Sequence, residues 1–130
     1  MSGLHHIELW VPDLAAAWHS WGWLLTELGW TVSDPGETTF EAQHGDVYLF
    51  VEQSPALSGR VHDRLAPGVN HLALHAGTRS HVDAMVAAAP EHGWTLLFPD
   101  RHPHAGGPQH YAAYLENEAG YEVELVAETP

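Results

Sequence analysis

The chain has 130 residues, of which 45% are hydrophobic and 16% are charged, a composition typical of one folded domain with a real core. Its formal net charge of −13 comes from 17 acidic residues against four arginines and no lysine. Such a charge argues against nucleic acid and anionic membranes as partners, because both bind cationic side chains. The chain has no cysteine, which excludes disulfides, thiolate metal sites and a cysteine nucleophile. We find neither a long apolar run nor a signal-peptide pattern, and we expect a cytoplasmic protein.

Two stretches of alternating apolar residues begin the two halves of the chain. The first lies at Leu4–Leu14 and the second at Val69–Thr78, and a period of two is typical of a strand. Each stretch meets a residue that can cap a helix, which is Asp13 in the first and Thr78 or Ser80 in the second. We therefore expect a strand followed by a helix in both halves.

The first half continues with a helix and three short strands. An apolar stripe predicts the helix over about residues 13–28, ended by Gly29, and we interpret Trp18 and Trp21 on this stripe as core residues. The strands are expected at residues 30–32, 38–42 and 47–52, with turns at residues 33–36 and 44–46. This order of elements is β-α-β-β-β.

The second half repeats the same plan. We expect a strand at 69–76, a helix at 80–92, a strand at 94–98, a long loop at 99–109, and a hairpin of strands 111–116 and 121–127. Glu27–Val32 is matched by Glu91–Leu96, which gives a repeat of about 65 residues, too long for a solenoid unit. The prediction is an α+β fold, with two tandem βαβββ modules forming curved mixed sheets around a cleft. We treat residues 1–130 as a single domain, with modules at 1–53 and 69–130 and a connection at 54–68.

Three strands place potential metal ligands on the faces that point away from the helices. The strand period puts His6 on that face in the first strand, His71 in its repeat, and Glu124 in the last strand. Two imidazoles and one carboxylate leave positions on a divalent cation open for substrate, as a catalytic metal requires. Any one of these residues alone is more often a solvated or hydrogen-bonded side chain. His6 and His71 occupy equivalent positions in the repeat, and this favours a metal-ligand role for the three residues over that alternative.

The same residues carry a resemblance to a known family. The segments His6–Leu14, Asn70–Leu74 and Tyr111–Leu125 resemble the vicinal oxygen chelate superfamily, over nearly the whole chain. That superfamily contains glyoxalase I, the type I extradiol dioxygenases, the fosfomycin-resistance enzymes and the bleomycin-resistance proteins. The resemblance implies paired βαβββ modules, a divalent metal such as Fe, Mn, Ni or Zn at the positions of His6, His71 and Glu124, and a homodimer.

Differences from the family patterns separate the subfamilies. When the last turns of the two modules are aligned by Gly45 and Gly120, Leu49 takes the position in the first module that is equivalent to Glu124. Glyoxalase I enzymes carry a fourth metal ligand at this position. Glu52 could take it only after a three-residue shift of the strand, which would reverse the face on which its side chain lies. The shortage of cationic residues argues against phosphonate recognition of the fosfomycin-resistance kind. The extradiol pattern, a histidine and a tyrosine before a turn containing Asp-Pro, is matched only in part.

Two further residues are candidates for catalysis. His110 precedes the strand that pairs with the Glu124 strand, and it is a candidate general base, although a surface histidine is the simpler alternative. Tyr114 lies on the same strand face and is either a substrate-steering residue or a packing tyrosine. The overall prediction is a metal-dependent lyase, isomerase or dioxygenase that chelates vicinal oxygens of a small-molecule substrate. The alternative is a metal-free protein, similar to the bleomycin-resistance group, that sequesters a cationic small molecule.

Overall fold

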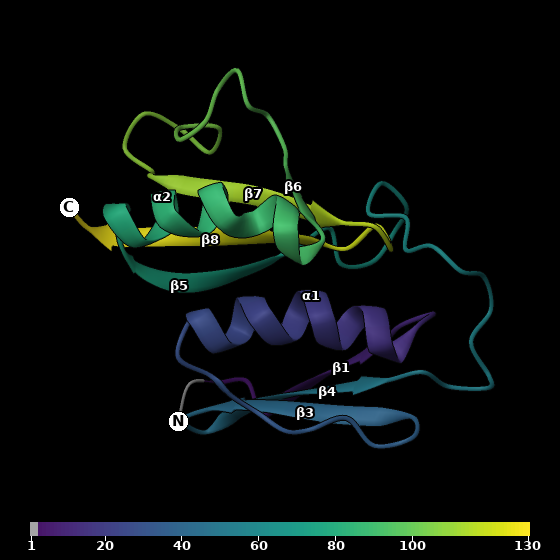
Figure 1. Cartoon of the computed structure of the whole chain (residues 1–130). Helices are drawn as coiled ribbons and strands as arrows, with labels where there is room; N and C mark the ends of the chain where they lie inside the picture. Colours follow the sequence, from purple (N-terminus) through teal and green to yellow (C-terminus); the bar gives the residue numbers. More distant parts are fainter. Residues whose placement is uncertain (1–2) are drawn as a thin grey trace. The chain divides into compact units, whose positions relative to one another are not determined.

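The computed structural model describes residues 3–130, which form two compact units divided between Val61 and His62. Unit 1 comprises residues 3–61 and unit 2 comprises residues 62–130. Each unit has one four-stranded mixed sheet with helix on one face, in the βαβββ order (Figure 1). The predicted α+β fold with two similar modules is therefore confirmed.

Unit 1 contains one long helix. Its elements are β1 (His6–Trp10), α1 (Leu14–Glu27), β2 (Thr31–Val32), β3 (Thr39–His44) and β4 (Val47–Glu52). The strands are ordered β1-β4-β3-β2, with β1 parallel to β4 and the other neighbours antiparallel. The Asp13 side chain accepts a hydrogen bond from the Ala16 N–H and so caps α1, as predicted. The left-handed backbone of Gly29, at φ +88°, follows the helix end.

Unit 2 repeats this topology. Its elements are β5 (Leu72–Thr78), α2 (Arg79–Ala88), a 3-10 turn η1 (Ala89–His92), β6 (Trp94–Leu96), β7 (Ala112–Asn117) and β8 (Glu122–Thr129). The strands are ordered β5-β8-β7-β6, and β5 runs parallel to β8. Thr78 caps α2 by accepting from the His81 N–H. The helix predicted to reach residue 92 stops at Ala88, because Pro90 has no N–H for an α-helical hydrogen bond and the chain tightens into η1.

Each unit buries its core between the helix and the sheet. α1 packs against β2 and β3, and α2 packs against β5 and β8. The largest fully buried side chain of unit 1 is Trp21 and that of unit 2 is Trp94, each with a relative exposure of 1%. Trp18 was expected in the core, but it is 39% exposed, because it lies at the margin of the apolar stripe, where its indole N–H reaches the Ser33 carbonyl at 3.1 Å.

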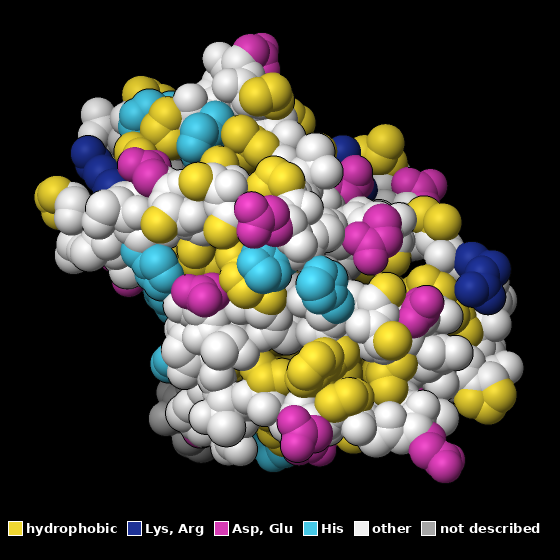
Figure 2. All heavy atoms as spheres, in the orientation of Figure 1, with side chains coloured by type: hydrophobic (Ala, Val, Ile, Leu, Met, Phe, Trp, Pro, Cys, Tyr) yellow, Lys and Arg dark blue, Asp and Glu magenta, His cyan; other side chains and the backbone are white. Residues whose placement is uncertain are grey.

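The surface carries the excess of acidic groups that the composition predicts. Asp and Glu side chains are spread over the face drawn in Figure 2, whereas Lys and Arg side chains are few. Among the described residues, no helix has the length and apolar character needed to cross a membrane.

Candidate functional site

The centre of the candidate site is the carboxylate of Glu124, which lies on the central strand β8 of unit 2. Its side chain is only 8% exposed and contacts two imidazoles. His71 Nε2 lies 3.0 Å from Glu124 Oε1, and His110 Nε2 is in hydrogen-bond contact with Glu124 Oε2. A carboxylate without a proton only accepts hydrogen bonds, so a proton or another cation has to lie between these atoms.

Strand register brings these side chains together from four places in the sequence. Ala73 of β5 and Tyr114 of β7 are the neighbours of Glu124 on either side. His71 precedes β5 and His110 lies two residues before β7, so both rings reach Glu124 from the ends of flanking strands. The structure thus places four of the predicted site residues, His71, His110, Tyr114 and Glu124, in one cluster on the sheet face opposite α2. We call this group the Glu124 cluster.

Tyr114 completes the Glu124 cluster. Burial raises the pKa of the Tyr114 hydroxyl, and the negative charge of Glu124 and a hydrogen bond to that carboxylate raise it further. The phenol therefore stays protonated at neutral pH. The Tyr114 ring also meets the rings of His71 and Phe98 edge to face, with ring centroids 5.7 Å apart in both pairs.

The long loop after β6 approaches the Glu124 cluster closely at Gly106. A Cβ atom added to Gly106 would lie 2.6 Å from the Tyr114 hydroxyl oxygen and 2.7 Å from His110 Cδ2. Both distances are shorter than real Cβ contacts. Only glycine lets this loop reach the two rings without displacing them.

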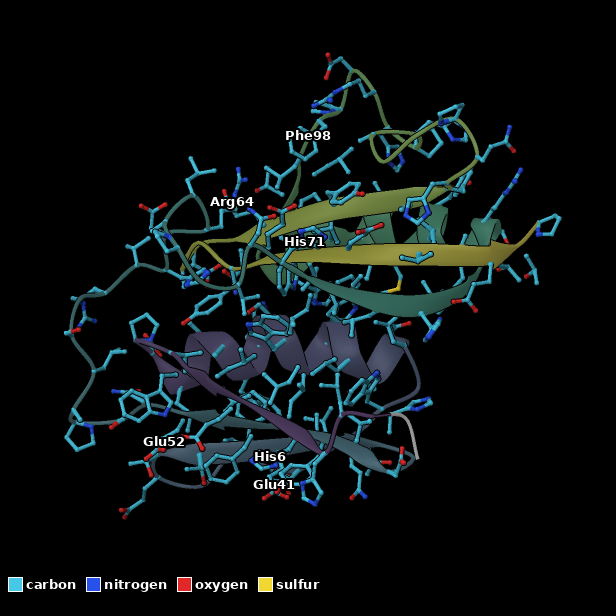
Figure 3. All side chains as sticks on the ribbon, turned by 180° about the vertical axis from the view of Figure 1, so that it is seen from behind. His6, Glu41, Glu52, Arg64, His71 and Phe98 are labelled. Carbon is cyan, nitrogen blue, oxygen red and sulfur yellow. The ribbon has the colours of Figure 1, made fainter. Side chains whose placement is uncertain are left out.

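An ion-pair group with one buried member, Glu122, lies beside the cluster. The Arg64 side chain, which comes from the segment before β5, contacts Glu116 Oε2 through Nε at 2.8 Å and Glu122 Oε1 through a terminal nitrogen at 3.2 Å. The second contact has ion-pair distance without hydrogen-bond geometry. Burial raises the pKa of Glu122, and the charges of Arg64 and His71 oppose that rise. Figure 3 shows Arg64 and His71 at the same end of the unit 2 sheet.

His6, the remaining predicted ligand, belongs to unit 1. Its ring stacks on Tyr48 at a centroid distance of 4.8 Å, and its Nδ1 lies 2.9 Å from His5 Nδ1. The side chain is exposed on the sheet face opposite α1, which Figure 3 shows together with Glu41 and Glu52. His6 thus lies at the place in unit 1 that His71 takes in unit 2.

The register corrects the predicted counterpart of Glu124 in unit 1. Glu8 and Ala73 are equivalent, because each lies two residues after its repeated histidine. Glu8 pairs with Phe50 of β4, and Ala73 pairs with Glu124 of β8. The counterpart of Glu124 in unit 1 is therefore Phe50 and not Leu49. The glycine alignment was wrong because the β3–β4 connection has two residues and the β7–β8 connection has four. Glu52 shares the face of Phe50, contrary to expectation, because the two residues are two positions apart in the strand. The position in unit 1 that is equivalent to Glu124 therefore carries an aromatic residue and no carboxylate.

The donor atoms of unit 2 suit a divalent cation in kind and spacing. Imidazole nitrogen and carboxylate oxygen bind Zn and similar divalent metals. Two such ligands at the right angles of an octahedral site, each about 2.1 Å from the metal, lie about 3 Å apart, and a tetrahedral site holds them about 3.4 Å apart. The 3.0 Å between His71 Nε2 and Glu124 Oε1 agrees with the octahedral spacing. Among residues 3–130, no group of three His, Asp or Glu side chains has a geometry that could hold a metal.

Sequence reasoning missed three residues around the cluster. Arg64 and Gly106 lie in irregular segments whose path no periodicity predicts. Asn70 was noticed only as part of a motif, yet its Oδ1 lies 2.7 Å from His71 Nδ1. Its position directly before a candidate ligand was the available signal, because the second ring nitrogen of a metal-binding histidine needs a partner.

Comparisons with known proteins find relatives along nearly the whole chain. The model of the Glyoxalase/Bleomycin resistance protein/Dioxygenase superfamily matches residues 5–114. The uncharacterized protein YqjT of Bacillus subtilis (strain 168) is 40% identical over 126 residues, which cover 95% of this chain and 98% of that protein. A crystal structure of a protein provisionally assigned as a glyoxalase, from Bacillus halodurans, is 38% identical with a TM-score of 0.89, covering 98% of this chain and 96% of that one. Lactoylglutathione lyase from Agrobacterium tumefaciens shares the fold, at 17% identity and a TM-score of 0.63 over 98% of this chain and 95% of that one.

Proposed function

Because the chain belongs to the Glyoxalase/Bleomycin resistance protein/Dioxygenase superfamily, we propose that it is a metal-dependent enzyme acting on a small substrate with two adjacent oxygens. His6, His71 and Glu124 are the proposed ligands of a divalent metal, Fe, Mn, Ni or Zn. The observation that carries the proposal is the Glu124 carboxylate, buried and contacted by two imidazole nitrogens. A bound divalent cation would supply a Lewis acid that polarises the two substrate oxygens.

The other residues of the cluster have roles that follow from their contacts. His110 is the proposed proton carrier, because its ring meets Glu124 at the edge of the cluster and remains partly exposed. Tyr114 is the cross-strand neighbour of Glu124, and its proposed role is to orient that carboxylate. Phe98 meets the Tyr114 ring edge to face, and the Gly106 backbone lies close to the Tyr114 hydroxyl, so both residues form part of the surroundings of that ring. Such a site supports proton transfer beside a polarised carbonyl or enol, the step common to isomerase and lyase reactions, and a dioxygenase reaction is the alternative chemistry.

Metal binding tests this proposal directly. We expect the protein, purified without a histidine tag, to carry a divalent metal by elemental analysis, and a metal-stripped sample to gain thermal stability from Mn, Fe, Ni or Zn. His71→Ala, His6→Ala and Glu124→Gln should each remove this response, because each deletes one ligand of three. His75→Ala is the matched control, since His75 lies four residues from His71 and its exposed ring contacts only Glu128 in the described structure. A wild-type protein that neither contains nor responds to any of the four metals would overturn the enzyme proposal.

A second candidate function rests on the unit 1 sheet face. Glu8, Glu41 and Glu52 lie there among the rings of Trp10, Tyr48 and Phe50. Carboxylates beside aromatic rings attract cations, and the net charge of −13 adds to that attraction. A metal-free protein that sequesters a cationic aromatic molecule is therefore the alternative. Calorimetry with such a cation distinguishes the two functions, because binding that survives metal removal and is lost in Glu41→Gln or Glu52→Gln favours sequestration.

We further propose that the protein is a homodimer. In the described part of the chain, β1 and β5 are edge strands of their sheets. A second copy of the chain can complete such an edge. Light scattering coupled to gel filtration measures the mass, and a value near that of one 14.3 kDa chain at all concentrations would contradict the dimer.

A further inference from the structure

Phe98 has a backbone conformation that bulky side chains avoid. Among residues 3–130 it is the one residue other than glycine with a left-handed φ, at +53°. This conformation costs free energy for any residue with a Cβ atom, and glycine at the same place would avoid that cost. The contacts around Phe98 therefore have to hold it there.

Backbone hydrogen bonds on both sides of Phe98 fix the path of the chain. Before it, the Leu97 N–H donates to the Tyr114 carbonyl at 2.8 Å, and after it the Phe98 carbonyl accepts the N–H groups of Arg101 and His102, both at 3.0 Å. Figure 3 shows Phe98 where the chain leaves the unit 2 sheet for the long loop. These bonds are made by main-chain atoms, so a glycine can form the same turn. The turn itself does not require an aromatic side chain.

The Phe98 ring lies at the end of a row of rings that leads to the Glu124 cluster. The ring meets Tyr114 edge to face, and Tyr114 meets His71 in the same way, with ring centroids 5.7 Å apart in both pairs. An edge-to-face contact contributes no more than such a backbone costs. Packing against Tyr114 therefore does not by itself explain a phenylalanine here. The Phe98 side chain is only half-buried, so part of it is open to a ligand.

We propose that Phe98 is a specificity-determining residue, whose ring contacts a planar, uncharged group next to the two adjacent oxygens of the substrate. The inference rests on the metal-dependent function proposed above, which places those oxygens at the Glu124 cluster. A phenylalanine ring has no hydrogen-bonding group, so its complement is apolar or aromatic. The Arg101 guanidinium already lies over this ring, 4.8 Å from its centroid, which disfavours a cationic group there.

The topology of the module does not require this backbone conformation. Trp30 and Trp94 are equivalent in the repeat, so the position of Phe98 corresponds to Asp34 in unit 1. Asp34 has no left-handed φ, although aspartate tolerates that conformation better than phenylalanine does. The strained residue thus occurs in the unit that carries the Glu124 cluster, and strained backbone that is retained in this way gathers at functional sites.

Two small chelators test the contact. Acetohydroxamate and benzohydroxamate both bind a metal through two adjacent oxygens, but only benzohydroxamate carries a planar ring. Calorimetry with the Zn²⁺-loaded protein gives the ratio of their affinities, and comparing this ratio between variants cancels the preference of the metal itself. Phe98→Gly should lower the ratio about 2- to 10-fold, the effect of one lost ring contact. Phe98→Leu should lower it as well, and Phe98→Tyr, which keeps the ring, should retain it.

Urea unfolding of the metal-free variants tests the strain. At ordinary positions a protein with alanine is more stable than one with glycine. Phe98→Gly should instead unfold at a higher urea concentration than Phe98→Ala, because both lack the ring and only alanine keeps a Cβ atom on left-handed backbone. The opposite order would show an unstrained backbone and would overturn the inference.

The outcomes separate this inference from the proposed function. A Zn²⁺-binding protein whose affinity ratio is the same in the wild type and in Phe98→Gly overturns the role of Phe98 and leaves the metal site standing. A wild type that binds neither Zn²⁺ nor the hydroxamates overturns the proposed function, and the substrate contact with it. The zinc content of the wild type thus distinguishes the two failures.

Discussion

Unit 1 and unit 2 have the same topology, yet they differ in the row of three paired residues that crosses the middle of the sheet face away from the helix. The two rows have their charged and uncharged side chains at opposite positions. In unit 2 the row is Ala73, Glu124 and Tyr114, with the carboxylate on the central strand. In unit 1 the row is Glu8, Phe50 and Glu41, with an aromatic ring at the centre and carboxylates on both sides. A carboxylate on the central strand is buried and accepts partners from both neighbours, whereas those on the flanking strands are exposed. The same module therefore forms a surface with a buried central carboxylate in unit 2 and a surface with a central aromatic ring between exposed carboxylates in unit 1.

The largest effect is expected where the two units agree, in their cores. Trp21→Ala in unit 1 and Trp94→Ala in unit 2 should each lower the free energy of unfolding by about 3–5 kcal/mol, because both indoles are fully buried and leave a cavity. Urea unfolding followed by far-ultraviolet circular dichroism measures both without relying on tryptophan emission. Trp18→Ala, at a partly exposed indole, is the control and should cost clearly less. A loss below about 1 kcal/mol at either core site would break the equivalence of the two cores.

An intermediate effect is expected at the close approach of the loop to the Glu124 cluster. Gly106→Ala should cost about 1–3 kcal/mol, because the new methyl group displaces the Tyr114 hydroxyl or the His110 ring. The same variant should reduce metal affinity or turnover, since His110 would lose its contact with Glu124. Gly36→Ala in unit 1 meets only ordinary contact with the Thr39 carbonyl at 3.5 Å and should be nearly neutral. Equal stabilities of the two variants would show that the loop does not pack on the cluster.

The smallest effect concerns Glu122 and its dependence on pH. Burial raises the pKa of this carboxyl in the folded state, so the folded protein binds its proton more tightly than the unfolded chain does. The wild type should therefore lose stability relative to Glu122→Gln as pH rises from about 4 through the raised pKa, by no more than about 1 kcal/mol. Arg64→Gln should enlarge this loss, because the guanidinium opposes the rise. Urea unfolding at a series of pH values tests the sign, and a gain of wild-type stability with rising pH would contradict it.

Local chemistry explains why most of the fold could be predicted from the sequence. Asp13 and Thr78 start their helices and Gly29 follows the end of α1 because capping and left-handed backbone depend on neighbouring residues alone. Pro90 also acts locally, but its effect on the end of α2 was overlooked. The family membership was predicted from the motifs and is confirmed by the comparisons.

The details of the site depend on contacts that sequence spacing does not contain. Strand parity placed Glu124 on the helix-free face and Tyr114 on the same strand face as His110, but identifying Phe50 as the counterpart of Glu124 required the real lengths of two turns. Arg64 and Gly106 act through irregular segments, whose three-dimensional path is set by packing and not by periodicity. The assignment of His6 with His71 and Glu124 as metal ligands stays a prediction.

The two units differ in tryptophan fluorescence, because the buried Trp94 is the single indole of unit 2. The other five tryptophans, which are Trp10, Trp18, Trp21, Trp23 and Trp30, all belong to unit 1. Intrinsic fluorescence will therefore report chiefly on unit 1. A Trp94→Phe protein would emit from unit 1 alone, and the difference between its spectrum and that of the wild type isolates the light from the unit that carries the Glu124 cluster. Ligand-induced changes in emission can in this way be attributed to one unit without an added label.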